Sequence, residues 1–335
     1  MHNYLLGLSL ATVILAGSSL ASAQEDHSAH HGHHNMSQED FARLRDVVDQ
    51  YKTMSDDEIM QSMAEMPGDY DWYVSDKAVR NDTGVLVLAH GAGEYGDRVF
   101  KQSLEPLASK QPVALGFGMA MMGSGHLQKA VDELTAAGAK RVVVVPAALS
   151  RNASVYRQWS YILGKRQQAA YLEAGQIKTD AELILRPVMG GHPLAAEIMR
   201  DYASEISETP EKEALIIVGH GPEDINDNQR ELAILRRHLD FLRQQTDFAS
   251  VRAINLQDDA PDEIRSANVG TLRSWISEAS AAGQRVLIVG YLMSTRGIQW
   301  KFKEDLKGLD YTLQTKGISS HPLFSHWIEL SVGAG

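Results

Sequence analysis

The chain has 335 residues, 44% of them hydrophobic and 22% charged, which is enough for a packed core in one large or two modest domains. Its net charge of -11 argues against a nucleic-acid partner, because nucleic-acid binding needs clustered Lys and Arg. The sequence contains no cysteine, which excludes disulfides, thiolate metal sites and cysteine nucleophiles.

The first residues have the pattern of a secretory signal. Leu5 to Ala16 is apolar, and Ala21-Ser22-Ala23 places small residues where a signal peptide is cleaved. We therefore predict a signal peptide over residues 1–23 and an exported, periplasmic mature protein that is not an integral membrane protein. The alternative is an uncleaved anchor.

A histidine-rich tract follows the signal. The string HSAHHGHH, residues 27–34, cannot build a core, so residues 24–36 are predicted to be disordered. Imidazoles on a flexible arm can bind Zn, Cu, Ni or Co. We expect these side chains to capture metal, although a solubilising tail would have the same composition: His27, His30, His31, His33 and His34.

Residues 37–83 are predicted to form an acidic helical arm. Between residues 24 and 83 there are fourteen acidic and five basic side chains, which accounts for most of the net negative charge. The arm also contains Met54, Met60, Met63 and Met66, a set that would suit copper. Because several of them recur at helical spacing, one apolar helix face is the favoured interpretation.

From Gly84 onward, strands alternate with helices. Runs of Val, Leu and Ile are typical of parallel strands covered on both faces, and the alternation predicts an α/β fold with doubly wound parallel sheets. The predicted strands are Val85–Ala89, Val113–Phe117, Arg141–Val145 and Leu183–Arg186, then Ala214–Gly219, Val251–Leu256, Arg285–Val289 and Tyr311–Gln314.

The two sets of strands read as copies of one unit. GGHPLAAEIM (190–199) returns as SSHPLFSHWI (319–328), and AAGAKRVVVVPAALS (136–150) returns as AAGQRVLIVGYLMS (281–294). We predict two homologous lobes, 84–210 and 211–335, that face each other across a cleft.

The first strand of each half ends at a His-Gly pair, His90-Gly91 and His220-Gly221. Ligands of parallel sheets bind outside the carboxyl ends of the strands. Glycine permits a sharp turn there, and a neutral imidazole can bind a divalent metal or accept a proton. We predict His90 and His220 as catalytic and metal-binding residues. The alternative is that each imidazole only hydrogen-bonds a neighbouring loop.

This series resembles the class II tetrapyrrole chelatases, the sirohydrochlorin cobalto- and ferrochelatases. The resemblance extends from Gly84 to about Ile328 and includes His-Gly after the first strand, VVVVP and GGHPLAAEI. It implies that a planar macrocycle binds in the cleft and receives a divalent ion (Co, Fe, Ni or Zn). His90 and His220 match the strand-end histidine of the family, and Gly91, Gly221, Ser150 and Ser294 are expected to contact the ligand.

Two features of that family are absent. Its second histidine follows the third strand, where this chain has SRNASVYRQW (150–159) and STRGIQWKFKED (294–305). Ser154 and Gln299 stand near the expected positions. Its acid follows the second strand, where GFGMAMM (116–122) has none and the second half offers Asp258 and Asp259. Either His90 and His220 act as a pair across the cleft, or the protein binds a ligand without inserting metal.

Other candidates carry less weight. His192 and His321, each before Pro-Leu at a predicted helix start, are expected either to line the metal site or to make a helix-terminal hydrogen bond. Met119, Met121 and Met122 would suit Cu(I), but methionine more often fills a core. His126, His238 and His326 are not expected to act.

The sequence is compatible with three functions to different degrees. The first is a chelatase-like protein that inserts or handles Co, Fe or Ni with a tetrapyrrole such as sirohydrochlorin. The second is a non-catalytic metal- or tetrapyrrole-binding protein, a metallochaperone or scavenger on the same fold. A hydrolase is disfavoured, because Met122 replaces the glycine that a G-x-S-x-G elbow needs before Ser124.

Overall fold

The computed structural model describes residues 36–48, 51–64, 73–91, 93–118, 120–121, 123–295 and 301–334. The chain divides into two compact units, Met1–Ser37 and Gln38–Gly335. The predicted signal peptide and the histidine tract lie outside the described residues. All the helices and strands discussed here belong to the second unit.

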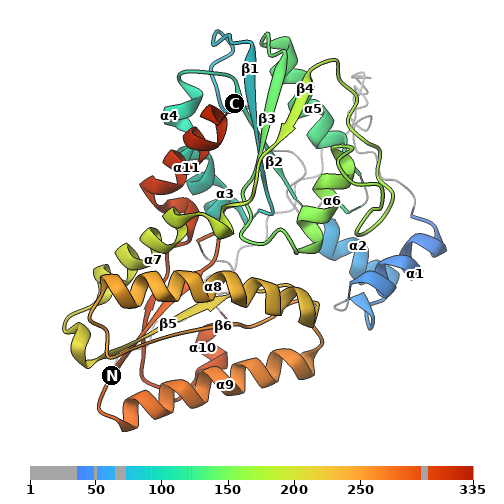
Figure 1. The fold of residues 1–335 in the computed structure, drawn as a ribbon. Helices are drawn as coiled ribbons and strands as arrows, with labels where there is room; N and C mark the ends of the chain where they lie inside the picture. The colour runs from blue at the N-terminus through green and yellow to red at the C-terminus, as the bar shows by residue number, and fades with distance from the viewer. Residues whose placement is uncertain are drawn as a thin grey trace, which may run out of the picture. The chain divides into compact units, whose positions relative to one another are not determined.

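Two four-stranded parallel sheets form the framework (Figure 1). Their strand orders are β2-β1-β3-β4 and β6-β5-β7-β8, the same permutation in both. The central strands are almost fully buried, as their apolar runs predict. The predicted α/β fold with two parallel-sheet lobes is confirmed. The strands are β1 (Thr83–Ala89), β2 (Val113–Phe117), β3 (Arg141–Pro146), β4 (Glu182–Leu185), β5 (Glu213–Gly219), β6 (Ser250–Asn255), β7 (Arg285–Tyr291) and β8 (Thr312–Gln314).

Helices cover the sheets and enclose three apolar clusters. One cluster packs the first sheet against α5 and α6, another packs the second sheet against α9, and the largest contains residues of both sheets. The helices are α3 (Gly93–Ser103), α4 (Glu105–Ala108), α5 (Gly125–Ala136), α6 (Ser154–Ile162), α7 (Pro193–Ile206), α8 (Ile225–Gln245), α9 (Asp262–Ala281), α10 (Phe302–Asp305) and α11 (Pro322–Gly333).

The last helix of each half packs on the sheet of the other half. Helix α7 contacts β7, β8 and α8, whereas α11 contacts β3 and α3. Figure 1 shows α7 beside α8 and α11 beside α3. The Tyr202 hydroxyl of α7 donates a hydrogen bond to the carbonyl of Gly317 at 2.9 Å, and Ser325 of α11 donates one to the carbonyl of Ser103. The predicted boundary between residues 210 and 211 follows the predicted sequence repeat, but the packing of the helices crosses it.

The acidic arm contains two helices, α1 (Gln38–Val47) and α2 (Asp56–Ala64). Ser55 caps α2, because its backbone N–H donates to Glu58 at 2.7 Å and its hydroxyl accepts from the Glu58 N–H at 3.3 Å. Ile59 of α2 is fully buried and Met60 half-buried, which fits the apolar-face interpretation of the methionines. The side chains of Met63 and Met66 lie outside the described residues.

None of the helices in the described part of the chain combines the length and the apolar character of a membrane span.

Candidate functional site

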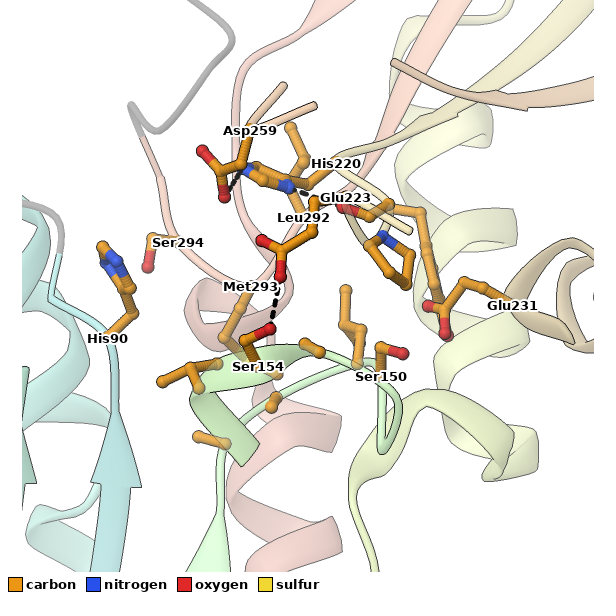
Figure 2. Close-up of a pocket in the computed structure, with 18 of the residues that line it drawn as sticks. His90, Ser150, Ser154, His220, Glu223, Glu231, Asp259, Leu292, Met293 and Ser294 are labelled. Carbon is orange, nitrogen blue, oxygen red and sulfur yellow. Dashed lines mark hydrogen bonds and ion pairs between the residues drawn. The ribbon is translucent and has the colours of Figure 1, made fainter. Parts of the chain in front are cut away.

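A cavity of about 340 Å³ lies at the carboxyl ends of both sheets (Figure 2). Residues that follow β1, β3 and β5 line it together with the end of β7. Parallel sheets bind ligands at this edge, and here two such edges share one space. The cleft predicted between the lobes is therefore present as a cavity lined by both halves.

The His-Gly pairs stand at this cavity because glycine lets the chain turn directly after the strand. Gly91 has a φ of 93° and Gly221 a φ of 76°, in the left-handed region that favours glycine. A Cβ on Gly221 would also lie 2.5 Å from the Cβ of Asn255, so that position has no room for a side chain. His90, Gly91, His220 and Gly221 all line the cavity, as do Ser150 and Ser294.

Both strand-end imidazoles are held in the same way. Nδ1 of His90 lies 3.1 Å from the Gly91 carbonyl oxygen, and Nδ1 of His220 lies 2.9 Å from that of Gly221. A carbonyl oxygen can only accept, so Nδ1 carries the proton in each ring. The Nε2 lone pair of each neutral ring is then available as a metal ligand or as a proton acceptor.

A carboxylate accompanies one of these imidazoles. Oδ2 of Asp259 lies 3.5 Å from Nε2 of His220, and Asp259 lines the cavity. Its neighbour Asp258 is buried instead, bound to Arg265 at 2.7 Å and to Lys301. Burial alone would raise the pKa of Asp258, but the hydrogen bonds from Lys301 and Arg265 outweigh it and hold the pKa low. Of the two acids expected from the sequence, the fold brings only Asp259 to the cavity.

A serine occupies the position near which the sequence predicted the loss of a family histidine. Ser154 begins α6, lines the cavity and donates a hydrogen bond to Glu223, which follows the His220-Gly221 turn. One turn later on α6, Arg157 pairs with the buried Asp227 of α8. The loop and helix that carry Ser154 are thus fixed to the second half of the chain.

Glu231 of α8 is a cavity residue that the sequence interpretation missed. Its side chain is 3% exposed, yet it contributes to the cavity wall. Burial raises its pKa to about 7, and a hydrogen bond from Ser150 opposes part of that rise. The sequence feature that could have identified Glu231 is its position on the buried face of α8, four residues before Leu235 and seven before the buried His238.

Tyr171, also missed, is held at the cavity by a buried amide. Gln158 of α6 is fully buried and makes four hydrogen bonds of 3.0–3.1 Å with backbone groups of residues 120 and 170–172. Burial raises the pKa of Tyr171, and the charges of Glu223 and Asp259 raise it further. Nε of Arg43 donates to the Tyr171 carbonyl at 2.9 Å, so the acidic arm supports this loop.

The fold does not bring His192 or His321 to the cavity wall. Each is the N-cap of a helix, because its Nδ1 accepts from the backbone N–H of Leu194 at 3.3 Å or of Leu323 at 3.2 Å. These are the helix-terminal hydrogen bonds that the sequence left as an alternative.

The structure describes only some of the other candidate metal ligands. Met121 is buried, whereas Met119, Met122 and the five histidines of residues 27–34 lie outside the described residues. Across the residues that the structure describes, no three His, Asp or Glu side chains are grouped so as to hold a metal ion.

Comparison with known proteins finds a family-model match in the first half of the chain. Residues 84–206 match the model of the CbiX family. A sirohydrochlorin cobaltochelatase from Methanothermobacter thermautotrophicus is 28% identical over 128 residues, which cover 35% of this chain and 88% of that protein. SirB from Bacillus subtilis, solved with Fe³⁺, is similar in fold with a TM-score of 0.55 and 14% identity, over 75% of this chain and 96% of SirB.

Proposed function

We propose that this chain, whose residues 84–206 match the model of the CbiX family, inserts a divalent metal ion into a tetrapyrrole bound in the cavity. The observation that carries the proposal is the His220–Asp259 pair at the carboxyl edge of the second sheet, on a cavity that also holds His90. An imidazole beside a carboxylate supplies the nitrogen and oxygen ligands that first-row divalent ions accept.

The lining of the cavity suits both substrates. Three carboxylates and two imidazoles line it, and its described lining contains no Lys or Arg, so the local field favours a cation. The carboxylates are Glu223, Glu231 and Asp259. Most of the remaining wall is apolar and includes residues 147–149, Val155, Leu292 and Met293, a surface on which the face of a macrocycle can lie.

His220 and Asp259 would hold the incoming ion. The hydrogen bond from Nδ1 to Gly221 orients the His220 ring and leaves Nε2 toward Asp259. A chelatase must release its ion to four ring nitrogens, so a small protein ligand set favours transfer over retention. The absence of a group of three ligands among the described residues is consistent with such a transient site.

Metal insertion exchanges two pyrrole N–H protons for one divalent ion, so the cavity must also accept protons. His90 comes from the other sheet, and because Nδ1 donates to Gly91, Nε2 is the ring nitrogen that can accept a proton. Figure 2 shows His90 apart from the His220–Asp259 pair. We assign His90 to the ring side of the cavity, as a proton acceptor.

Metallation of defined substrates tests the proposal. The purified protein, residues 24–335, would be mixed with sirohydrochlorin or with a porphyrin and with Co²⁺, Fe²⁺, Ni²⁺ or Zn²⁺, and the absorbance of the metallated ring followed against a protein-free control. We expect insertion above the spontaneous rate for at least one pair, and its loss in His220→Asn. No acceleration with either ring class would remove the enzymatic assignment.

A non-catalytic binding protein is the second candidate, and one observation favours it. The carboxylates of the described lining all come from the second half, so His90 lacks the acid that accompanies His220. Isothermal calorimetry separates the two functions. Tight, stoichiometric binding of metal or ring without turnover would support a metallochaperone or scavenger.

We further propose that the reaction occurs in the periplasm, after cleavage before Gln24, with the histidine tract gathering ions. The apolar segment and the Ala21-Ser22-Ala23 site support export. N-terminal sequencing of the protein recovered from a periplasmic fraction should begin at Gln24. An uncleaved protein in the membrane fraction would contradict this.

A further inference from the structure

Glu231 differs from the other acids of the cavity in its burial and its partners. It lies on α8 one turn after Asp227, and Figure 2 shows its carboxyl group beside Ser150. Ser150 donates a hydrogen bond to it, and Oε2 of Glu231 has no hydrogen-bond partner among the described residues. A buried carboxylate oxygen on a cavity wall without a donor is costly unless something else supplies a proton.

Asp227, one turn earlier on α8, is ion-paired, whereas Glu231 has no ion pair among the described residues. Asp227 is equally buried at 3% exposure, and it binds Arg157 and Arg230. No such cation accompanies Glu231 in the described residues, and burial is the main reason that its pKa rises to about 7. Asp227 is therefore held between two guanidinium groups, whereas Glu231 can be neutral or charged.

The other groups around Glu231 do not neutralise it. From β7, Tyr291 donates its hydroxyl proton to the Gly190 carbonyl at 2.8 Å, and its pKa is raised by burial and by the charge of Glu231. Two turns along α8, His238 lies 2.6 Å from the same carbonyl through Nε2, and burial lowers its pKa. Both groups stay uncharged near neutral pH. The negative charge on this side of the cavity is therefore removed by protonation of Glu231 itself.

We propose that Glu231 is a catalytic proton acceptor, which takes one of the two pyrrole protons when the metal enters the ring; this rests on the proposed chelatase function. One ring N–H bond breaks, an O–H bond forms on the Glu231 carboxylate, and the nitrogen lone pair binds the ion. The second proton goes to an imidazole, for which His90 is available. No electron is transferred.

The acids of the second half then have different roles. Asp259 is 46% exposed beside His220 and must stay anionic to hold a cation. Glu231 is buried beside Ser150 and must be able to become neutral. The first half offers no equivalent, because the residue eleven positions after His90 is Lys101, whereas Glu231 stands eleven after His220.

Glu231→Gln tests this role, because glutamine keeps an acceptor for Ser150 but cannot take a proton at neutral pH. We expect the rate of insertion at saturating metal and ring to fall at least about tenfold, since general bases contribute roughly 10²–10⁴. The pH–rate profile should lose an ionisation near 7, while the dissociation constant for Co²⁺ alone stays unchanged. Asp240→Asn, an exposed acid on the same helix, is the control and should keep the wild-type profile.

Infrared difference spectra between pH 5 and pH 9 give a readout without turnover. A protonated-carboxyl band that titrates near pH 7 should be present in the wild type and absent in Glu231→Gln. If the wild type is active and Glu231→Gln keeps its insertion rate and pH–rate profile, the role of Glu231 is overturned while the proposed function stands. Loss of Co²⁺ affinity in Glu231→Gln would have the same meaning. If the wild-type protein metallates no ring, the proposed function is overturned instead. In that case no ring proton is available for Glu231 to accept.

Discussion

His220 and Asp259 approach each other to 3.5 Å between Nε2 and Oδ2, and the part of the first half that the structure describes has no equivalent pair. The segment that follows β2, GFGMAMM, contains no acid to accompany His90. The two lobes share one order of strands but contribute different chemistry. The second supplies the carboxylates of the described lining, and the first supplies His90, two serines and much of the apolar wall.

The same Asp→Asn substitution should affect metal binding at Asp259 and stability at Asp258. Asp259→Asn is expected to weaken Co²⁺ binding by about 10–100-fold, as when a metal site loses a carboxylate partner, with little effect on stability because the side chain is well exposed. Asp258→Asn should lower the free energy of unfolding by about 2–3 kcal/mol, less than the full cost of breaking a buried ion pair because Arg265 keeps Asp305. Calorimetric titration and urea unfolding of both variants measure this. A larger loss of Co²⁺ affinity in Asp258→Asn would contradict the assignment.

His220 and His321 should fall into two different functional groups. His220→Asn is expected to reduce Co²⁺ affinity more than about tenfold, the lower bound for losing even an outer-shell partner. His321→Asn should leave affinity unchanged, because His321 caps α11 and asparagine is a good N-cap. Equilibrium dialysis with Co²⁺ compares the two variants, and circular dichroism checks the fold. Equal losses of affinity would mean that the cap histidine also binds metal.

Much of the fold follows from local sequence patterns. The prediction of β2 at Val113–Phe117 is confirmed to the residue, and β1 and β3 differ by one or two residues at an end. The exchange of α7 and α11 could not be predicted in this way. Both helices follow a His-Pro start and bury an apolar face, which does not specify the sheet that each one covers, and the predicted repeat alone suggests that each half packs on itself.

The cavity residues at strand ends could be predicted from the sequence, whereas those positioned by loops or helix packing could not. His90 and His220 could be placed on one cavity because the carboxyl ends of parallel strands meet at one edge. Glu223, Tyr171 and Glu231 reach the cavity through a loop or a packed helix, which strand periodicity does not report. That His90 and His220 bind metal stays a prediction.

Removal of the histidine tract separates two kinds of metal binding. Deletion of residues 27–34 is expected to lower the total Co²⁺ bound while one equivalent remains at the cavity. The reason is that His220 and Asp259 belong to the folded unit Gln38–Gly335 and do not depend on the tract. Metal analysis of the truncated protein, with and without His220→Asn, measures both populations. Loss of all Co²⁺ on deletion would place the metal entirely on the tract.

The buried carboxyl of Glu231 should make the protein less stable as the pH rises. Its pKa is about 7 when folded against about 4.5 when exposed, so the folded chain holds this proton more tightly than the unfolded chain. That contribution is complete below pH 4.5 and is lost as the pH rises through 7, a change of about 3 kcal/mol at about 1.4 kcal/mol for each unit. Glutamine at this position cannot titrate in the same range. The stability of Glu231→Gln relative to wild type should therefore increase by about 3 kcal/mol between pH 4.5 and pH 8.

Urea unfolding at several pH values measures that difference, and Asp240→Asn, exposed on the same helix, should run parallel to the wild type. A variant-to-wild-type difference that stays constant with pH would mean that Glu231 is charged throughout this range. It would then need a cation beside it, and the metal itself would be the candidate. The same carboxyl would in that case belong with Asp259 as a ligand rather than with His90 as a proton acceptor.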